Sequence, residues 1–153
     1  MTPKEQKYEL MLKEAAALLD GEDDLIANMA NLAALIHETM GFWWTGFYIV
    51  RKGTDGTGQL VLGPFQGPIA CTRIALGRGV CGTSWQRRET IVVPDVEKFP
   101  GHIACSSESR SEIVVPVFSE NKVTAVLDID SRHLNTFDDT DARYLERIVT
   151  LLA

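Results

Sequence analysis

Two consecutive β-strand patterns constrain the fold of this chain more than any other feature. They cover residues 112–118 and 122–130, which predicts adjacent antiparallel strands joined by a short turn. Successive side chains of a strand point to opposite faces, so Asp128 and Asp130 share one face at the end of an otherwise apolar strand. Two like charges placed together in this way are unfavourable, which indicates that a function uses them.

Glu112 begins the first of these strands, and its face depends on the length of the connecting loop. A loop with an odd number of residues, such as 119–121, places Glu112 on the same face as Asp128 and Asp130. A two-residue loop sends it to the opposite face. For each acid, the alternative to a functional role is a solvated strand end.

The remaining patterns place helices at both ends of the chain. Thr2 and Glu5 have the spacing of a capping box, which predicts a helix from Pro3 to about Gly21. Hydrophobic periodicity and turn residues indicate the other elements. These are helices over about 23–41, 80–88 and 136–152, and strands over 42–50, 60–62, 70–76 and 90–93. This order predicts an α+β fold with one central, mostly antiparallel sheet, in a single domain of residues 1–153.

The composition is typical of a soluble globular protein. Of the 153 residues, 45% are hydrophobic and 24% are charged, and the net charge is −6. An acidic chain lacks the basic surface with which proteins bind nucleic acids and anionic membranes. No apolar run approaches the roughly 20 residues that cross a bilayer, and the chain begins with a polar helix pattern instead of a signal core. We therefore expect a cytoplasmic protein with neither nucleic acid nor membrane as a partner.

Three cysteines, Cys71, Cys81 and Cys105, are candidates for redox chemistry. They are separated by 10 and 24 positions, and His102 does not complete a tetrahedral zinc set with them. Cys105 lies in a long polar loop, residues 95–111, where a thiol is accessible as a redox cysteine must be. Cys81 fits a buried core position instead. Redox function and structural packing stay open as equal alternatives, and we expect no metal.

Residues 77–82 satisfy the G-x-G-x-x-G pattern of a dinucleotide-binding loop. The predicted helix that follows is short, and the next strands form a hairpin instead of βαβ units. We therefore interpret Gly79 and Gly82 as parts of a tight turn that allows close packing, and nucleotide binding is a minor alternative.

An aromatic cluster at residues 42–48 predicts one wall of a pocket. Alternation places Trp44, Gly46 and Tyr48 on one face of a strand, and Trp43 on the other. One face belongs to the core. The other can line a pocket floor, where Gly46 leaves room for a ligand.

Taken together, several segments resemble the free methionine-R-sulfoxide reductases, a catalytic branch of the GAF fold. The segments are LGPFQG at 62–67, GRGVCG at 77–82, GHIAC at 101–105, SEIVVP at 111–116 and VLDID at 126–130. The resemblance implies a GAF-like domain with a central antiparallel sheet of about six strands. Helices would pack on one face of this sheet, and a small-molecule pocket would lie on the other.

The resemblance also implies residue roles. Cys105 resembles the nucleophile, Cys71 the resolving cysteine and Cys81 a third cysteine. An acidic pocket for the amino group and the sulfoxide, with an aromatic wall, is implied at Glu112, Asp128, Asp130, Trp44 and Tyr48.

The implied activity is reduction of free L-methionine-(R)-sulfoxide without a cofactor. Cys105 would become a sulfenic acid and then form a disulfide with Cys71, which a thioredoxin-like reductant would recycle. The crowded carboxyls would supply the proton, because mutual repulsion raises the pKa of at least one of them. A homodimer is compatible with the fold. The alternative function is a non-catalytic GAF-type module that binds a small ligand or senses redox state.

Overall fold

The computed structural model describes residues 1–53, 55–102 and 108–152. Its centre is a six-stranded sheet in the order β3-β2-β1-β6-β5-β4, and all pairings among the described residues are antiparallel. The strands are β1 (Trp44–Lys52), β2 (Gly58–Gln66), β3 (Arg73–Ala75), β4 (Ile91–Val93), β5 (Ser111–Ser119) and β6 (Lys122–Ser131). The helices are α1 (Pro3–Leu19), α2 (Leu25–Met40), α3 (Gly79–Arg87) and α4 (Asp139–Val149), with short 3-10 turns at Val96–Lys98 and Thr150–Leu152. The predicted α+β class is confirmed.

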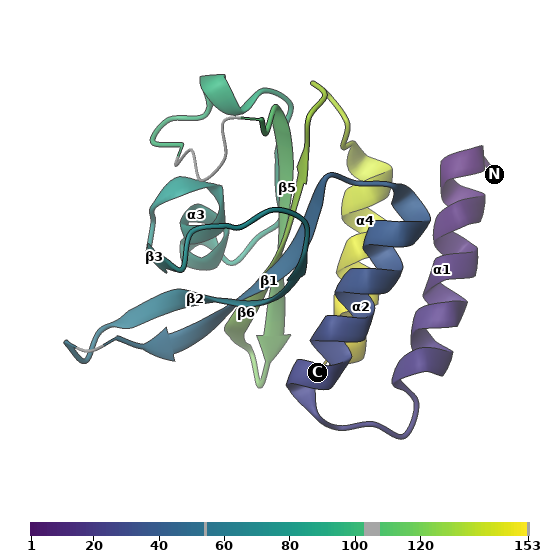
Figure 1. Ribbon diagram of the computed structural model, residues 1–153, viewed down its shortest axis with the longest axis horizontal. Coiled ribbons are helices and arrows are strands. Elements are labelled where there is room, and N and C mark those ends of the chain that lie inside the picture. Colours follow the sequence, from purple (N-terminus) through teal and green to yellow (C-terminus); the bar gives the residue numbers. More distant parts are fainter. Residues whose placement is uncertain (54, 103–107, 153) are drawn as a thin grey trace.

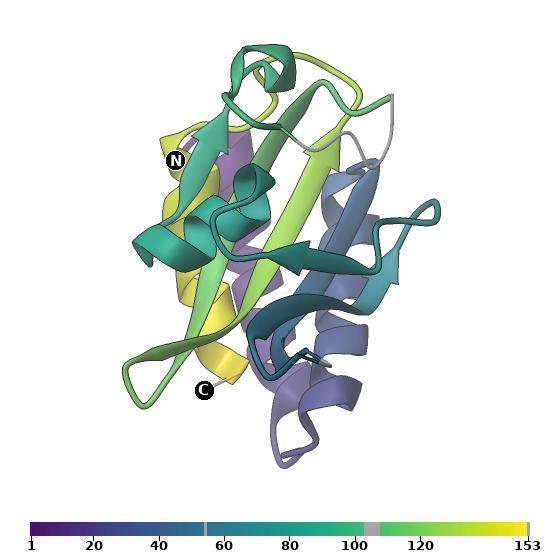
Figure 2. The same ribbon diagram turned by 90° about the vertical axis from the view of Figure 1, so that its left-hand side faces the viewer.

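The sheet separates two layers of different character. Helices α1, α2 and α4 cover one face, whereas α3 lies on the opposite face (Figure 1). The view turned by 90° looks onto the α3 side, with the other helices behind the sheet (Figure 2). The helix-covered face buries the larger apolar cluster, which includes Phe47, Leu127 and Ile129. Among the described residues, no helix has the length and apolar character needed to cross a membrane.

The predicted helix signals in the first forty residues are confirmed. Thr2 accepts a hydrogen bond from the amide of Glu5, and the Glu5 side chain returns to the Thr2 backbone, which completes the capping box. Asp24 caps α2, which begins at Leu25, two residues after the start predicted at about residue 23. Gly41 ends α2 in a left-handed conformation with φ of 70°, which glycine adopts without strain.

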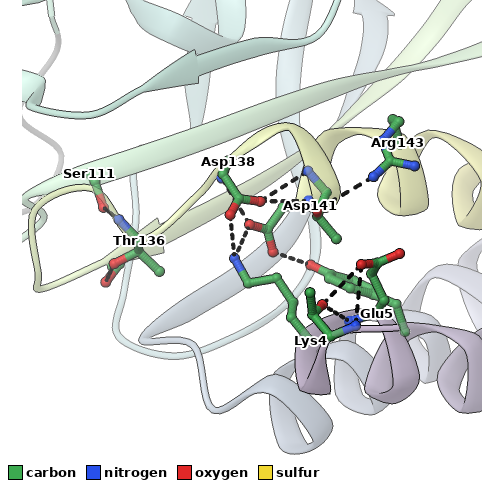
Figure 3. Close-up of polar contacts among 11 residues, drawn as sticks. Lys4, Glu5, Ser111, Thr136, Asp138, Asp141 and Arg143 are labelled. Atoms are coloured by element: carbon green, nitrogen blue, oxygen red, sulfur yellow. Dashed lines mark hydrogen bonds and ion pairs between the residues drawn. The ribbon is translucent and has the colours of Figure 1, made fainter.

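A polar network joins α1 to the start of α4 (Figure 3). The Lys4 ammonium donates to Asp141 at 2.7 Å and lies 3.3 Å from Asp138. The Tyr8 hydroxyl also donates to Asp141, at 2.5 Å, and the Tyr8 ring stacks on Tyr144. Asp138 is the N-cap of α4, and its backbone amide donates to Asp141 at 2.9 Å. The buried Asp141 carboxylate therefore has donors on both of its oxygens.

The alternation predicted for β6 is confirmed. Leu127 and Ile129 join the cluster under α1, α2 and α4, while Val126 joins the cluster on the α3 side. Asp128 and Asp130 therefore lie on the α3 side of the sheet.

The expectation that a two-residue loop would turn Glu112 to the opposite face is wrong. Ser119 pairs with Lys122, so the loop does have two residues, and both have the positive φ angles of a tight hairpin turn. At the register shift between Val117 and Phe118, Val117 pairs with Ala125 and Phe118 with Val123, so β6 contains one extra residue, Thr124. The extra residue of this β-bulge shifts the pairing by one position, which has the same effect on the sheet faces as an odd-numbered loop. Glu112 therefore pairs directly with Asp130 on the same face.

Candidate active site

A pocket opens on the α3 side of the sheet, where β1, β5 and β6 meet the start of α3. It encloses about 570 Å³ when the space open to solvent is counted. Its lining consists of Trp43, Trp44, Tyr48, Ile69, Ala70, Ile74, Arg78, Gly79, Val80, Cys81, His102, Ser109, Glu112, Asp128 and Asp130. The predicted acids, the predicted aromatic pair and Cys81 therefore meet in one place.

The three acids converge because two neighbouring strands deliver them to one sheet face. Glu112 begins β5 and is the register partner of Asp130 on β6, and Asp128 lies two residues earlier on the same face. Glu112 and Asp128 are each only 6% exposed. Carboxylates are seldom buried this deeply unless they are paired, so this cluster is the most unusual feature of the pocket.

Burial raises the pKa of all three carboxyl groups. For Glu112 and Asp130 the pKa rises well above its ordinary value, because burial and the nearby charge of Asp128 both disfavour the ionised form. Burial also raises the pKa of Asp128, but hydrogen bonds from its protonated neighbours act in the opposite direction. The cluster therefore retains protons at pH values where isolated carboxyls have lost them, and its negative charge is best held on Asp128.

One atom of this cluster lacks a partner. Asp128 Oδ1 is buried and has no hydrogen-bond partner among the described residues. Its acidic neighbours can donate to it only while they are protonated. A buried acceptor without a donor costs about 1–3 kcal/mol, so the pocket favours an occupant that brings a donor or a positive charge.

His102 and Ser109 contact the acids from the segment between β4 and β5. His102 Nε2 lies 3.8 Å from Glu112 Oε1, and burial lowers the pKa of the His102 imidazole. The Ser109 hydroxyl donates to Asp130 Oδ1 at 2.9 Å. The sequence pattern suggested His102 only as a zinc ligand and gave no signal for Ser109, because nothing in a polar loop indicates which hydroxyl will reach an acid.

The aromatic wall consists of Trp44 and Tyr48 from β1. The Trp44 indole donates to the carbonyl of Pro68 and the Tyr48 hydroxyl to the carbonyl of Cys71, both at 2.9 Å. Their rings stack with centroids 6.1 Å apart. The polar ends of both side chains are thus satisfied, and the rings are held as a fixed apolar surface.

Two details predicted for this wall are wrong. Trp43 lines the pocket instead of pointing to the opposite face, because β1 begins only at Trp44 and strand alternation does not extend to it. Gly46 leaves no room for a ligand. A Cβ there would lie 2.4 Å from Phe65 and 2.6 Å from the Trp44 ring, so the glycine admits these aromatic side chains.

The cysteines occupy different positions. Cys81 is a buried free thiol in the first turn of α3, where burial and the charges of Asp128 and Glu112 raise its pKa well above the usual value. Cys71 precedes β3 and is disulfide-bonded. Cys105, the predicted nucleophile, lies outside the described residues. His102 and Ser109, on either side of it in sequence, both line the pocket.

The glycine pattern at 77–82 forms a turn packed against β3. Gly79 has a φ of 62°, and a Cβ at Gly82 would lie 2.6 Å from the carbonyl oxygen of Ala75. Because α3 follows a three-residue strand of an antiparallel sheet, the βαβ context of a dinucleotide site is absent from this region. This geometry supports the interpretation that these glycines allow close packing.

One group of side chains has the spacing of a metal site. The ligand atoms of Cys81, Glu112 and Asp128 all lie within 4.8 Å of one another, and all three residues are buried. These residues come from α3, β5 and β6, so the tertiary fold alone brings them together.

Comparison with known proteins identifies relatives over nearly the whole chain. The GAF domain model matches residues 22–153. GAF domain-containing protein A of Dictyostelium discoideum is 56% identical over 149 residues, which cover 97% of this chain and 92% of that protein. The free methionine-R-sulfoxide reductase of Escherichia coli is 43% identical over 150 residues, which cover 97% of this chain and 88% of that protein.

A solved structure extends the similarity to the fold. The free methionine-R-sulfoxide reductase from Neisseria meningitidis, in complex with its substrate, superposes with a TM-score of 0.94 at 50% sequence identity. The match covers 99% of this chain and 89% of that one. A six-stranded sheet with helices on one face and a pocket on the other defines the architecture as a GAF domain. The chain belongs to the free methionine-R-sulfoxide reductases, a family of oxidoreductases.

Proposed function

We propose that this protein reduces free L-methionine-(R)-sulfoxide to L-methionine with thiols as the electron source. The observation that carries the proposal is the convergence of three carboxyl groups on one pocket, two of them buried (Glu112 and Asp128) and one half-buried (Asp130). A free amino acid brings an ammonium group that a peptide-bound methionine lacks. A buried acidic pocket therefore favours the free sulfoxide over the same group inside a protein.

The acids bind the substrate at its polar groups. The substrate ammonium can donate to Asp128 Oδ1, the acceptor that has no partner among the described residues. The rings of Trp44 and Tyr48 provide an apolar surface for the methyl thioether carbon. This arrangement holds the sulfoxide between an aromatic wall and a source of protons.

Proton supply follows from the raised pKa of the acids. A sulfoxide sulfur is a poor electrophile until its oxygen accepts a hydrogen bond or a proton. Glu112 and Asp130 retain protons because burial and the charge of Asp128 raise their pKa. Either can serve as the general acid, a contribution of about 10²–10⁴-fold in rate.

The redox steps balance with two cysteines. The Cys105 sulfur attacks the protonated sulfoxide, the S–O bond of the sulfoxide breaks, and its oxygen is transferred to the Cys105 sulfur. The sulfoxide is reduced to methionine, which leaves, and the Cys105 thiol is oxidised to a sulfenic acid. The Cys71 thiol attacks the sulfenic sulfur, a disulfide forms and water leaves. A thioredoxin-like dithiol then reduces that disulfide and is itself oxidised. The disulfide at Cys71 and the free thiol at Cys81 support the assignment of Cys71 and Cys105 as the pair.

The alternative function is a GAF module that binds a small ligand or senses redox state without turnover. Such a module uses the same pocket but needs no proton donor beside its ligand. The raised pKa of Glu112 and Asp130 favours the enzyme, because a group that only binds an ammonium works best when ionised.

Turnover of defined substrates tests the proposal. The wild-type protein is incubated with a thioredoxin system and with the free R-sulfoxide, the free S-sulfoxide or an acetylated, amidated methionine-R-sulfoxide. We expect methionine only from the free R-sulfoxide, and none from the Cys105→Ser variant. Equal turnover of the blocked substrate would overturn the role of the acids. Tight sulfoxide binding without turnover would refute the enzyme and favour the non-catalytic binding module.

We propose further that residues 1–153 act as one cytoplasmic domain whose partners are a small-molecule substrate and a thioredoxin-like reductant. A homodimer is compatible with this arrangement, and analytical ultracentrifugation tests it. Neither a cofactor nor a resident metal ion takes part in the proposed reaction.

A further inference from the structure

Cys81 has no part in the proposed reduction, yet its thiol faces the acids directly. It is buried in the first turn of α3, and its sulfur lies within 4.8 Å of ligand atoms on Glu112 and Asp128. We propose that Cys81, Glu112 and Asp128 form a binding site for a thiophilic divalent cation of the zinc class, and that this ion competes with the substrate for the pocket. The competition rests on the proposed function, whereas the binding does not.

The donor set determines the class of ion. Hard cations such as Mg²⁺ and Ca²⁺ take oxygen ligands, but Zn²⁺ accepts sulfur, nitrogen and oxygen donors at about 2.0–2.3 Å. A thiol beside two carboxylates therefore favours a zinc-class ion. His102 can supply the fourth ligand, because its Nε2 lies 3.8 Å from Glu112 Oε1 and an imidazole nitrogen is a common ligand of zinc-class ions.

A second, independent observation points to an occupant at this position. Asp128 Oδ1 is buried, belongs to a residue only 6% exposed, and has no hydrogen-bond partner among the described residues. A dication on Asp128 would satisfy this oxygen and offset the repulsion among the crowded acids.

Competition follows from the shared oxygen. We assign Asp128 Oδ1 to the ammonium of the substrate, and the same atom would bind the metal. Both cations cannot occupy it at once, so either one must raise the apparent dissociation constant of the other.

The binding test uses Co²⁺, a spectroscopic substitute for Zn²⁺, on the fully oxidised protein. In that form the proposed Cys71–Cys105 disulfide removes two of the three thiols, and Cys81 remains. We expect one Co²⁺ per chain, a sulfur-to-cobalt charge-transfer band, and displacement of Co²⁺ by Zn²⁺. The Cys81→Ser variant should lose the band and bind Co²⁺ more weakly by more than about tenfold.

Matched variants guard against indirect effects. Glu112→Gln should weaken Co²⁺ binding while retaining the band, and the exposed Glu120→Gln should change neither. Thermal melting of each variant verifies that it folds. Absence of a band in the folded wild-type protein, or a band that persists in Cys81→Ser, would overturn the metal site.

The competition is tested in the same oxidised protein, which cannot turn over. Free L-methionine-(R)-sulfoxide should raise the apparent Kd for Co²⁺ in proportion to its concentration. A Kd that does not change while the sulfoxide binds would refute competition. A protein that binds Co²⁺ as described but does not reduce the sulfoxide would refute the proposed function and leave the metal site intact.

Discussion

Two buried aspartates in this molecule differ in the hydrogen-bond donors that surround their carboxylates. Asp141, at the junction of α1 and α4, is 1% exposed and accepts hydrogen bonds from Lys4, Tyr8 and the backbone of Asp138. Asp128, in the pocket, is 6% exposed, and its Oδ1 has no partner among the described residues. A cation and two further donors surround Asp141, as Figure 3 shows in part, whereas two other acids and a thiol surround Asp128.

The two environments indicate a structural role for the Asp141 carboxylate and a binding role for the Asp128 carboxylate. A buried acid with a full set of donors stabilises the contact between two helices and leaves nothing for a ligand to satisfy. A buried acid among other acids destabilises the fold until something positive or protic arrives. The fold can supply donors where it uses a carboxylate structurally, so the lack of a donor at Asp128 Oδ1 indicates a binding site.

The largest expected effect follows from removing the charge of Asp128. Asp128→Asn should lower kcat/KM for the free R-sulfoxide by about 10²–10⁴-fold, because it removes the ammonium partner and disturbs the proton held by its neighbours. The free energy of unfolding should stay the same or rise, because a crowded charge is lost. Steady-state kinetics and urea unfolding measure the two quantities. A variant with reduced stability and full activity would show that Asp128 has a structural role instead of a binding role.

The opposite result is expected at Asp141. Asp141→Ala should reduce the free energy of unfolding by about 2–3 kcal/mol, because it removes charge-assisted hydrogen bonds and leaves the Tyr8 hydroxyl without its acceptor. The remaining folded protein should keep its kcat/KM, since α1 and α4 lie on the sheet face away from the pocket. Urea unfolding with parallel activity measurements checks this. Strong loss of activity in a stable variant would link the two regions.

The pH dependence of stability should have opposite signs in the two regions. Glu112 has a folded-state pKa raised by burial, so both states hold its proton below the unfolded pKa, and stability falls as the pH rises from there towards the folded pKa. While only the unfolded state ionises, the loss is about 1.4 kcal/mol per pH unit. Glu112→Gln should remove this loss and be more stable than the wild type at neutral pH.

Asp138 should make stability depend on pH in the opposite direction from Glu112, and its effect appears at acid pH. Burial is the largest single influence and opposes its ionisation, but the hydrogen bonds from the Asp141 amide and Lys4, together with the Lys4 charge, outweigh it and lower the pKa of Asp138. Its contribution is present above the unfolded pKa and is lost as the pH falls through the folded pKa. Melting temperatures from pH 3 to pH 9, for the wild type, Glu112→Gln and Asp138→Asn, separate the two trends. A Glu112→Gln curve parallel to the wild type would contradict the assignment of a raised pKa.

The smallest effect is expected at an exposed ion pair on α4. Arg143 donates to Asp139 at 3.0 Å, and the two side chains are 56% and 86% exposed. Solvent screens such a pair, so Arg143→Ala should change the free energy of unfolding by less than about 0.5 kcal/mol. This variant calibrates the measurement at Asp141, which lies between Asp139 and Arg143 on the same helix. A loss as large as that of Asp141→Ala would mean that exposure does not distinguish the two pairs.

Strand alternation predicted the faces of the sheet, and capping residues predicted where the first helices begin. The bulge at Thr124, opposite Val117 and Phe118, could not be predicted, because no residue pattern there requires it, and it decides whether Glu112 joins the other acids. The position of Gly46 was predicted correctly but its neighbours were not. Which side chains fill the space beside a glycine depends on tertiary packing, here of Phe65 and Trp44.

The site could be predicted only where it depends on local sequence patterns, and not where it depends on tertiary packing. Asp128 and Asp130 follow from a period of two residues within one strand. The contacts of Ser109 with Asp130 and of His102 with Glu112 depend on how the chain between β4 and β5 crosses the strand ends. No local signal encodes that path. Cys105 lies in this part of the chain, outside the described residues, so its role as nucleophile stays a prediction.

A count of free thiols before and after substrate tests the central claim most directly. The reduced protein is treated with one equivalent of free L-methionine-(R)-sulfoxide without a reductant, and the remaining thiols are alkylated and mapped by mass spectrometry. We expect the loss of two thiols, at Cys71 and Cys105, with Cys81 still alkylated and one methionine formed per chain. An unchanged thiol count, or oxidation at Cys81 in place of Cys105, would contradict the account.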